Sequence, residues 1–210
     1  MVKLLHYTPL KIADLAISKC WDKPTKEGIN VDRIERVANK NKHASTIEHL
    51  NYNFDITISR ACLQELARHR HTSLSVKSSR YTLKELMNED PFDWDYNETD
   101  ERATKYLIFT GNKSVDEASI KGLEELRILV ANNVSNDHSK YAMPEAYKTS
   151  LIWTINARSL QNFLSLRTST SALWEIRVLA YNIHDNIPEE HKFLFKDSIY
   201  KEPTDTKEIK

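Results

Sequence analysis

The segment LNYNFDITI, residues 50–58, alternates apolar and polar side chains without a break. A period of two is typical of a strand that buries one face and leaves the other face polar. Ser59 follows directly, and its hydroxyl is suited to cap a helix over residues 60–69, with Cys62 on the apolar face. We therefore expect a strand that leads straight into a helix.

Helical periodicity surrounds this strand on both sides. Apolar residues spaced by three and four predict helices over residues 9–20, 31–41 and 114 to about 131, then a short strand at 151–155, a helix after it, and a last long helix that ends near Pro188. Ser114 and Glu117 match a capping box, and Val115 and Ala118 are expected to face inward. The stretch rich in Asn, Asp and Glu at 88–99 is interpreted as a surface excursion.

These elements predict one α+β domain over residues 1–200, in which helices pack against a mostly antiparallel sheet. Residues 201–210 are predicted to form a polar tail. The 30 basic and 30 acidic side chains cancel, so no overall field favours nucleic acid or a membrane surface. No apolar run is long enough to span a membrane, and the first residues do not resemble a signal peptide. We expect a soluble, cytoplasmic protein.

The numbers and positions of the cysteines and glycines exclude several kinds of binding site. The two cysteines, Cys20 and Cys62, are too few for a disulfide framework or a thiolate zinc site, and both are interpreted as small core residues. With no HxxxH or HExxH pattern either, no metal site is expected. None of the three glycines lies in a GxGxxG or GxxxxGKS motif. A bound nucleotide must therefore be held by side chains rather than by a glycine-rich loop.

The segment from Arg68 to Tyr81 concentrates cations and hydroxyls. It holds four arginines and lysines, two histidines, four serines and one threonine, with no acidic residue. Guanidinium groups bind phosphate through two parallel hydrogen bonds, and hydroxyls complete the shell around the anion. The segment suits a mononucleotide phosphate or a flavin pyrophosphate, while a solvated basic turn is the alternative that composition leaves open.

Three motifs in order indicate a family. Arg68-His69-Arg70, then seven residues, then Ser78 is the first; the second is HASTIEH at 43–49, and the third is NARSLQNFLSLR at 156–167, followed by Trp174-Glu175. Together they resemble the flavin-dependent thymidylate synthases, and the resemblance runs from about residue 6 to 195. It implies the reductive methylation of dUMP to dTMP, with FAD, with 5,10-methylenetetrahydrofolate as carbon donor and with NADPH as reductant. It also implies a homotetramer whose FAD sites are shared between subunits.

The resemblance assigns roles to individual residues of this chain. The FAD contacts it implies are Ser45, Arg68, His69, Arg70, Val76, Asn156, Arg158 and Asn162. The dUMP contacts it implies are Glu65, Leu66, Ala67, Arg68, Val76, Lys77, Ser78, Ser79, Arg80, Lys140 and Arg167, with Ser78 and Arg80 on the phosphate. Arg167 is the implied catalytic residue, because a fixed cation beside the uracil ring favours its anionic form.

Several positions depart from the common family pattern. Ser75-Val76 replaces Asn-Glu, Glu65 replaces Gln, Lys140 replaces Arg, and Ser171 stands where some members have His. Two other readings stay open on the residues alone. One is a nucleotide- or RNA-binding module that uses the Arg/His/Ser segment as a phosphate clamp, and the other is a diverged flavoprotein that oxidises NADPH without methylating dUMP.

Overall fold

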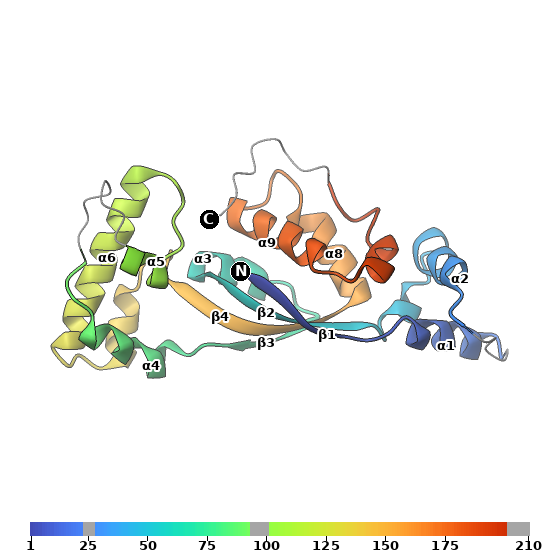
Figure 1. The fold of residues 1–210 in the computed structure, drawn as a ribbon, viewed down its shortest axis with the longest axis horizontal. Helices are drawn as coiled ribbons and strands as arrows, with labels where there is room; N and C mark the ends of the chain where they lie inside the picture. The colour runs from blue at the N-terminus through green and yellow to red at the C-terminus, as the bar shows by residue number, and fades with distance from the viewer. Residues whose placement is uncertain (23–27, 93–100, 201–210) are drawn as a thin grey trace. The chain divides into compact units, whose positions relative to one another are not determined.

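The computed structural model describes residues 1–22, 28–92 and 101–200 (Figure 1). The chain divides into two compact units, the first made of Met1–Ile56, Leu66–Ser75 and Ile152–Lys210, and the second of Thr57–Glu65 and Val76–Leu151. Strands β2 (Asn51–Ser59) and β4 (Lys148–Asn156) each run from one unit into the other. A single domain over 1–200 stays a prediction. The predicted tail at 201–210 and residues 93–99 of the predicted excursion lie outside the described residues.

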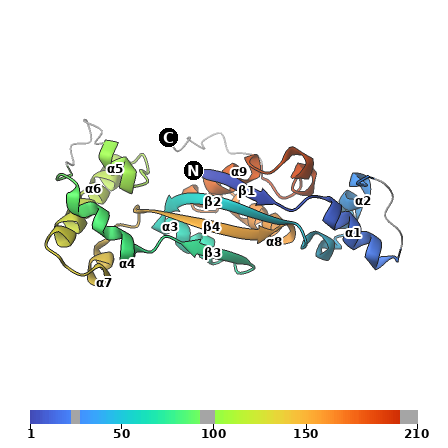
Figure 2. The same cartoon turned by 60° about the horizontal axis from the view of Figure 1, so that its bottom comes forward.

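A four-stranded sheet is the centre of the first unit. Its order is β1-β2-β4-β3, where β1 covers Val2–Tyr7 and β3 covers Thr72–Val76, and Figure 2 shows the strands in this order. The alternation predicted for β2 is confirmed, since Tyr52, Phe54 and Ile56 are fully buried. β1 pairs with β2 in the antiparallel sense. The α+β fold with a mostly antiparallel sheet is thus confirmed.

Strand β1 is an element that the sequence pattern did not predict. Val2 pairs with Ile56 and Leu4 with Phe54, but the next pair joins His6 to Asn53, so Leu5 is an extra residue in the ladder. Val2 and Leu4 are half-buried before this irregularity. After it, the next half-buried residue is Tyr7, where an unbroken alternation would have given His6. Because a bulge breaks the period of two, the alternation that marks a strand is absent from the sequence.

Helices cover the sheet of the first unit. In Figure 1, α8 (Ala157–Arg167) and α9 (Trp174–Asp185) lie together on one face, and Phe163 of α8 packs on Trp153 of β4 with ring centroids 4.9 Å apart. The predicted helix at 31–41 is confirmed as α2 (Val31–Glu35), continued by the π-helical turn η1 (Arg36–Lys40). The remaining elements of this unit are α1 (Lys11–Cys20) and the short 3₁₀ turns η2 (Ala44–Ile47) and η5 (Glu189–Leu194).

The second unit is helical around α6 (Lys113–Ala131). It also contains most of α3 (Arg60–Ala67), with α4 (Ser79–Thr82), η3 (Leu83–Asn88), α5 (Glu101–Tyr106), α7 (Asn136–Ser139) and η4 (Lys140–Ala142). Its core is a separate cluster formed by Leu83, Leu86, Phe92, Ala103, Tyr106, Leu107, Ile120, Leu123, Leu126, Val130 and Tyr147. Burial of this cluster holds η3 and α5 against α6.

The helix caps confirm one prediction and correct another. Ser59 caps α3 as predicted, since its Oγ accepts the main-chain N–H of Cys62 at 3.0 Å. The capping box at Ser114 is wrong, because Asn112 is the N-cap and α6 begins at Lys113. The cause is Asp116, which is almost fully buried and accepts N–H bonds from the preceding loop. Its burial turns Val115 and Ala118 outward, against the prediction.

The two cysteines differ in environment. Cys62 is fully buried on the apolar face of α3, as expected. Cys20 is exposed at the end of α1, so its interpretation as a core residue is wrong. Helical spacing places it on the stripe of Ala13 and Ile17, but the helix ends there. The apolar stripe of α1 therefore continues to Cys20, beyond the part of the helix that is buried in the core.

Candidate functional site

The N-terminus of α8 is built by the NARSLQNFLSLR segment. Asn156 is the last residue of β4 and the N-cap of α8, and its Oδ1 accepts the main-chain N–H of Ser159 at 2.9 Å. The main-chain N–H of Ala157 donates to Leu50 O at 2.8 Å, which fixes the helix to the end of β2. The positive end of the helix dipole therefore stands at a rigid position.

A cavity of about 590 Å³ opens beside this helix end in the first unit. Its lining residues come from the three motifs found in the sequence, and they are Glu48, His69, His71, Asn156, Arg158, Ser159 and Asn162. Four of the predicted FAD contacts are thus brought together in one cavity: His69, Asn156, Arg158 and Asn162. We call it the α8 cavity.

His69 is held in one tautomer. Its Nε2 lies 3.0 Å from the main-chain oxygen of Ser159, and because a carbonyl can only accept, Nε2 carries the hydrogen. Burial lowers the pKa of His69, the positive charge of Arg167 lowers it further, and the bond to Ser159 opposes the shift only in part. The ring is therefore a neutral imidazole whose Nδ1 is a hydrogen-bond acceptor.

Arg158 crosses the α8 cavity to Glu48. Its Nη1 donates to Glu48 Oε1 at 2.6 Å, and the two side chains are 57% and 44% exposed. An ion pair this open contributes about 0–1 kcal/mol, because water screens it. Arg158 is therefore positioned by Glu48 but can exchange that carboxylate for the anion of a ligand at little cost.

Three further arginines of the predicted site, Arg68, Arg70 and Arg167, belong to the first unit. Arg167 is the last residue of α8 and is half-buried, close enough to His69 to influence its titration. Arg68 and Arg70 flank His69 and are exposed. The basic segment thus supplies a neutral acceptor between cations, a combination that suits a ligand with both a heterocycle and a phosphate.

Ser45 lies in a different cavity of the first unit, with a volume of about 500 Å³. Its lining is mostly apolar and comes from α1, from η2 and from the residue His49 that follows η2: Ile12, Leu15, Ala16, Lys19, Cys20, Ser45, Thr46 and His49. Glu48 of the α8 cavity and His49 of this one are adjacent in the chain. The second motif, HASTIEH, therefore contributes to both cavities.

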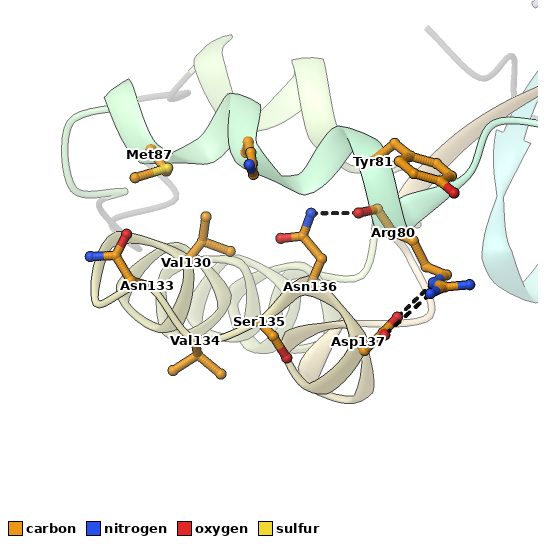
Figure 3. Close-up of a pocket in the computed structure, with 10 residues that line it drawn as sticks. Arg80, Tyr81, Met87, Val130, Asn133, Val134, Ser135, Asn136 and Asp137 are labelled. Carbon is orange, nitrogen blue, oxygen red and sulfur yellow. Dashed lines mark hydrogen bonds and ion pairs between the residues drawn. The ribbon is translucent and has the colours of Figure 1, made fainter.

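The second unit holds Arg80, which is predicted to bind the substrate phosphate, and Lys77, another predicted dUMP contact. Arg80 forms a two-pronged ion pair with Asp137, Nε to Oδ1 at 2.7 Å and Nη2 to Oδ2 at 3.3 Å (Figure 3). Lys77 donates to Glu85 Oε1 at 3.0 Å. Asn136 Nδ2 donates to the main-chain oxygen of Arg80 at 2.6 Å. Each cation is thus paired with a carboxylate of its own unit.

A cavity of about 410 Å³ lies beside Arg80 in this unit. Lys84 and Met87 of η3 and the residues that connect α6 to α7 line it, and Figure 3 shows Arg80 directed at Asp137 along one side. Ser78 precedes α4 and is exposed, and Ser79 is the first residue of that helix. Lys140 begins η4 and is half-buried.

The predicted site residues divide between the two units. Those in the first unit are Ser45, Leu66, Ala67, Arg68, His69, Arg70, Asn156, Arg158, Asn162 and Arg167, and those in the second are Glu65, Val76, Lys77, Ser78, Ser79, Arg80 and Lys140. Sequence reasoning missed Ser159, whose carbonyl sets the tautomer of His69, and Asp137, the partner of Arg80. Ser159 lies inside a quoted motif, but a main-chain role leaves no mark in a side-chain pattern. Asp137 lies 57 residues from Arg80, so no local spacing connects them.

Within 1–22, 28–92 and 101–200, no three His, Cys, Asp or Glu side chains gather as metal ligands, and the absence of a metal stays a prediction. Among the helices of the same residues, none has the length and apolar character needed to cross a membrane.

Known proteins similar to the chain cover nearly all of it. Residues 3–191 match the family described as thymidylate synthase complementing protein. The chain is 54% identical over 207 residues to a flavin-dependent thymidylate synthase of Campylobacter jejuni strain RM1221, covering 96% of this chain and 98% of that protein. It is 57% identical over 202 residues to a flavin-dependent thymidylate synthase of Wolinella succinogenes, covering 92% and 96%.

The fold is also similar to a solved structure. The crystal structure of thymidylate synthase X from Helicobacter pylori with FAD and dUMP superposes with a TM-score of 0.89. That protein is 50% identical to this chain, and the superposition covers 94% of this chain and 98% of the Helicobacter chain.

Proposed function

The chain belongs to the family of flavin-dependent thymidylate synthases, and on that basis we propose how its residues bind FAD and convert dUMP to dTMP. The enzyme uses FAD as cofactor and dUMP as substrate. We propose 5,10-methylenetetrahydrofolate as carbon donor and NADPH as reductant. With these reactants dUMP, methylenetetrahydrofolate, NADPH and a proton give dTMP, tetrahydrofolate and NADP⁺, so atoms and electrons balance.

The observation that carries the cofactor assignment is the chemistry of the α8 cavity. A flavin combines a heterocycle that has an imide N–H with a pyrophosphate. The neutral His69 offers an acceptor, and Arg158 and the capped N-terminus of α8 offer positive charge. The residues present therefore fit the group. When bound, reduced flavin supplies the hydride that the reductive methylation requires.

The proposed FAD contacts are the residues of the three motifs. Asn156, Arg158 and Asn162 on or before α8, with His69 opposite, line the α8 cavity. Ser45, from the second motif, lines the other cavity of the first unit. Arg68, Arg70 and Val76 complete the proposed set. Side chains and one helix terminus take the place of a glycine-rich loop, in agreement with the three isolated glycines.

The proposed dUMP contacts hold the nucleotide at both ends. Ser78 and Arg80 bind the phosphate. The other proposed contacts are Glu65, Leu66, Ala67, Arg68, Val76, Lys77, Ser79 and Lys140. Arg167 contacts the uracil ring. Its fixed positive charge favours the ionised ring over the neutral one, which makes the ring a better nucleophile toward the one-carbon unit.

The proposal extends to assembly and location. We propose a homotetramer in which the FAD sites are shared, and in which both compact units of each chain act as one functional domain. Exposed apolar side chains support an interface, since Leu166 of α8 is 56% exposed and Leu173 is 41% exposed. A cytoplasmic location is proposed from the cysteine content, which requires no oxidising compartment.

The direct test is dTMP formation by the purified protein. With FAD, methylenetetrahydrofolate, NADPH and dUMP present, dTMP is expected, and omission of any one of the last three should abolish it. Flavin binding with NADPH oxidation but no dTMP would leave a diverged flavoprotein. Absence of both flavin binding and dTMP would favour the phosphate-binding module.

A further inference from the structure

Asp137 lies outside all three motifs and forms an ion pair with Arg80. Its carboxylate takes two hydrogen bonds from Arg80, one from Nε and one from Nη2. A guanidinium group has five N–H donors in one plane. Asp137 therefore occupies the side edge of the plane. Among the residues that the structure describes, no other side chain is bonded to this guanidinium, so its end edge, formed by Nη1 and the second hydrogen of Nη2, is free.

The free edge has the geometry that phosphate requires. Two parallel N–H groups on one side of a guanidinium match two oxygens of a phosphate. One arginine can therefore bind a carboxylate along its Nε edge and a phosphate along its other edge at the same time. The pair seen in the structure does not block the proposed role of Arg80.

Asp137 is itself held in place. It lies in α7, and the preceding residue, Asn136, donates from Nδ2 to the main-chain oxygen of Arg80 at 2.6 Å. Figure 3 shows these two contacts side by side, one to the main chain and one to the side chain of Arg80. Helix α7 thus fixes both the backbone and the guanidinium of a single residue.

Two opposing effects of Asp137 on phosphate binding can be compared. Its negative charge repels the phosphate, but Arg80 and Asp137 are each 59% exposed, so water screens this repulsion. Without Asp137, an exposed arginine side chain would have to be fixed from many rotamers when it binds phosphate. Solvent screening does not reduce this loss of conformational entropy. Ordering in advance is the larger effect at an exposed site.

We infer that Asp137 is a positioning residue, which orients the guanidinium of Arg80 for the phosphate of dUMP before the nucleotide arrives. The inference rests on the proposed function, in which Arg80 binds that phosphate. It adds a residue and a mode of action: a carboxylate acts from behind the arginine rather than on the substrate.

The test is Asp137→Asn in the full-length enzyme with FAD bound. The asparagine keeps the size of the side chain but removes the charge and one of the two acceptors. We expect the KM for dUMP to rise roughly tenfold, because the arginine must then be ordered on binding, while kcat at saturating dUMP stays within about twofold. FAD affinity should be unchanged.

Two comparisons separate positioning from general loss of structure. Inhibition by deoxyuridine, which lacks the phosphate, should be equal in wild type and Asp137→Asn. In an Arg80→Ala background the second substitution should add nothing, because the two residues act as one unit. The matched control is Glu117→Gln, which removes the carboxylate of another ion pair of the same unit, that of Lys113 with the half-buried Glu117. That control should keep the wild-type KM.

Each contrary result overturns the inference. An unchanged KM would mean that Arg80 does not need Asp137 to orient its guanidinium. A lowered KM would mean that Asp137 competes with the phosphate for Arg80. An equal loss of deoxyuridine binding would assign it a purely structural role. A wild-type enzyme that forms no dTMP would overturn the proposed function itself, so the two failures are distinguishable.

Discussion

The imidazole of His69 donates through Nε2 to the main-chain oxygen of Ser159, 3.0 Å away, and its ring meets the edge of Phe163 with centroids 5.6 Å apart. Ser159 in turn is fixed by the side chain of Asn156, which accepts its N–H. The cap of one helix therefore determines the position of the carbonyl that selects the tautomer of a histidine from a distant motif. At the proposed FAD site, the orientation of His69 therefore depends on a main-chain atom.

His69 is expected to stay neutral in the physiological range. Because burial lowers its pKa below the ordinary value of about 6.5, the ring should take up a proton only at lower pH. Nitrogen-15 NMR of labelled protein should show the Nε2–H tautomer from pH 8 to about 6.5. The same residue in urea-unfolded protein should titrate near about 6.5. A half-protonated His69 at pH 7 would contradict this assignment.

Asn156 is expected to serve both stability and flavin binding. Asn156→Ala removes the cap of α8 and should lower the free energy of unfolding by about 1 kcal/mol. It should also weaken FAD binding, because it frees the first turn of α8, whose Ser159 carbonyl holds His69. Thermal unfolding and a flavin fluorescence titration measure the two effects.

The matched control for Asn156→Ala is Asn112→Ala. Asn112 caps α6, with Oδ1 accepting from Val115 N at 3.4 Å, and lies in the other unit. This variant should lose stability but keep wild-type affinity for FAD. If both variants lose FAD to the same degree, the cap of α8 has no special role in the cofactor site.

Arg167 is expected to act on the reaction more than on cofactor binding. Arg167→Ala should retain FAD and lower kcat for dTMP by about 10²- to 10³-fold, as for removal of one electrostatic donor at a developing anion. Arg167→Lys keeps the charge but not the planar fork, so it should recover part of the loss. Turnover of Arg167→Ala close to wild type would refute the assigned role.

The buried pair Tyr52–His191 is expected to make stability depend on pH. The Tyr52 hydroxyl lies 2.7 Å from His191 Nδ1, both side chains are fully buried, and burial lowers the pKa of His191. The folded state therefore resists a proton that the unfolded chain accepts below about pH 6.5. The unfolded state binds more protons in that window, so the free energy of unfolding falls as pH falls through it.

The variant His191→Gln removes this titration. The glutamine keeps a polar partner for Tyr52. At pH 8, where the buried histidine is neutral, the variant should nevertheless be less stable than wild type. Below about pH 6.5 its stability should fall less steeply, with the remaining slope due to the half-buried histidines His69 and His184, whose pKa values are also lowered. Urea unfolding at pH 8, 7, 6 and 5.5 gives both slopes. Parallel slopes would show that His191 does not contribute.

Parts of the fold with local causes could be predicted from sequence. The alternation over β2 and the hydroxyl of Ser59 depend on neighbours in the chain, and both appear as expected. β1 could not be predicted, because the bulge at Leu5 hides its period. The start of α6 was misplaced because Asp116 binds the preceding loop instead of facing solvent. Tertiary contacts decide such positions.

The candidate site shows the same division. Motif residues such as His69 and Arg158 could be identified from their order along the chain, and the structure brings them into one cavity. Their partners could not. The Arg158–Glu48 pair spans 110 residues and the Arg80–Asp137 pair spans 57, and no spacing rule reaches across such distances. In these two pairs, charge compensation is arranged by the fold rather than by the local segment.

The interrupted layout of the first unit has a consequence for synthesis of the chain. Tyr7 donates to Glu190 across 183 residues, and Tyr52 meets His191 across 139. Contacts this distant in sequence slow folding, and they cannot form until the last helices have left the ribosome. Most of the second unit, Val76–Leu151, is continuous and emerges earlier. We expect it to begin folding during translation, before the first unit can form its long-range contacts. The first unit, while still incomplete on the ribosome, is then the part of the chain most prone to aggregation.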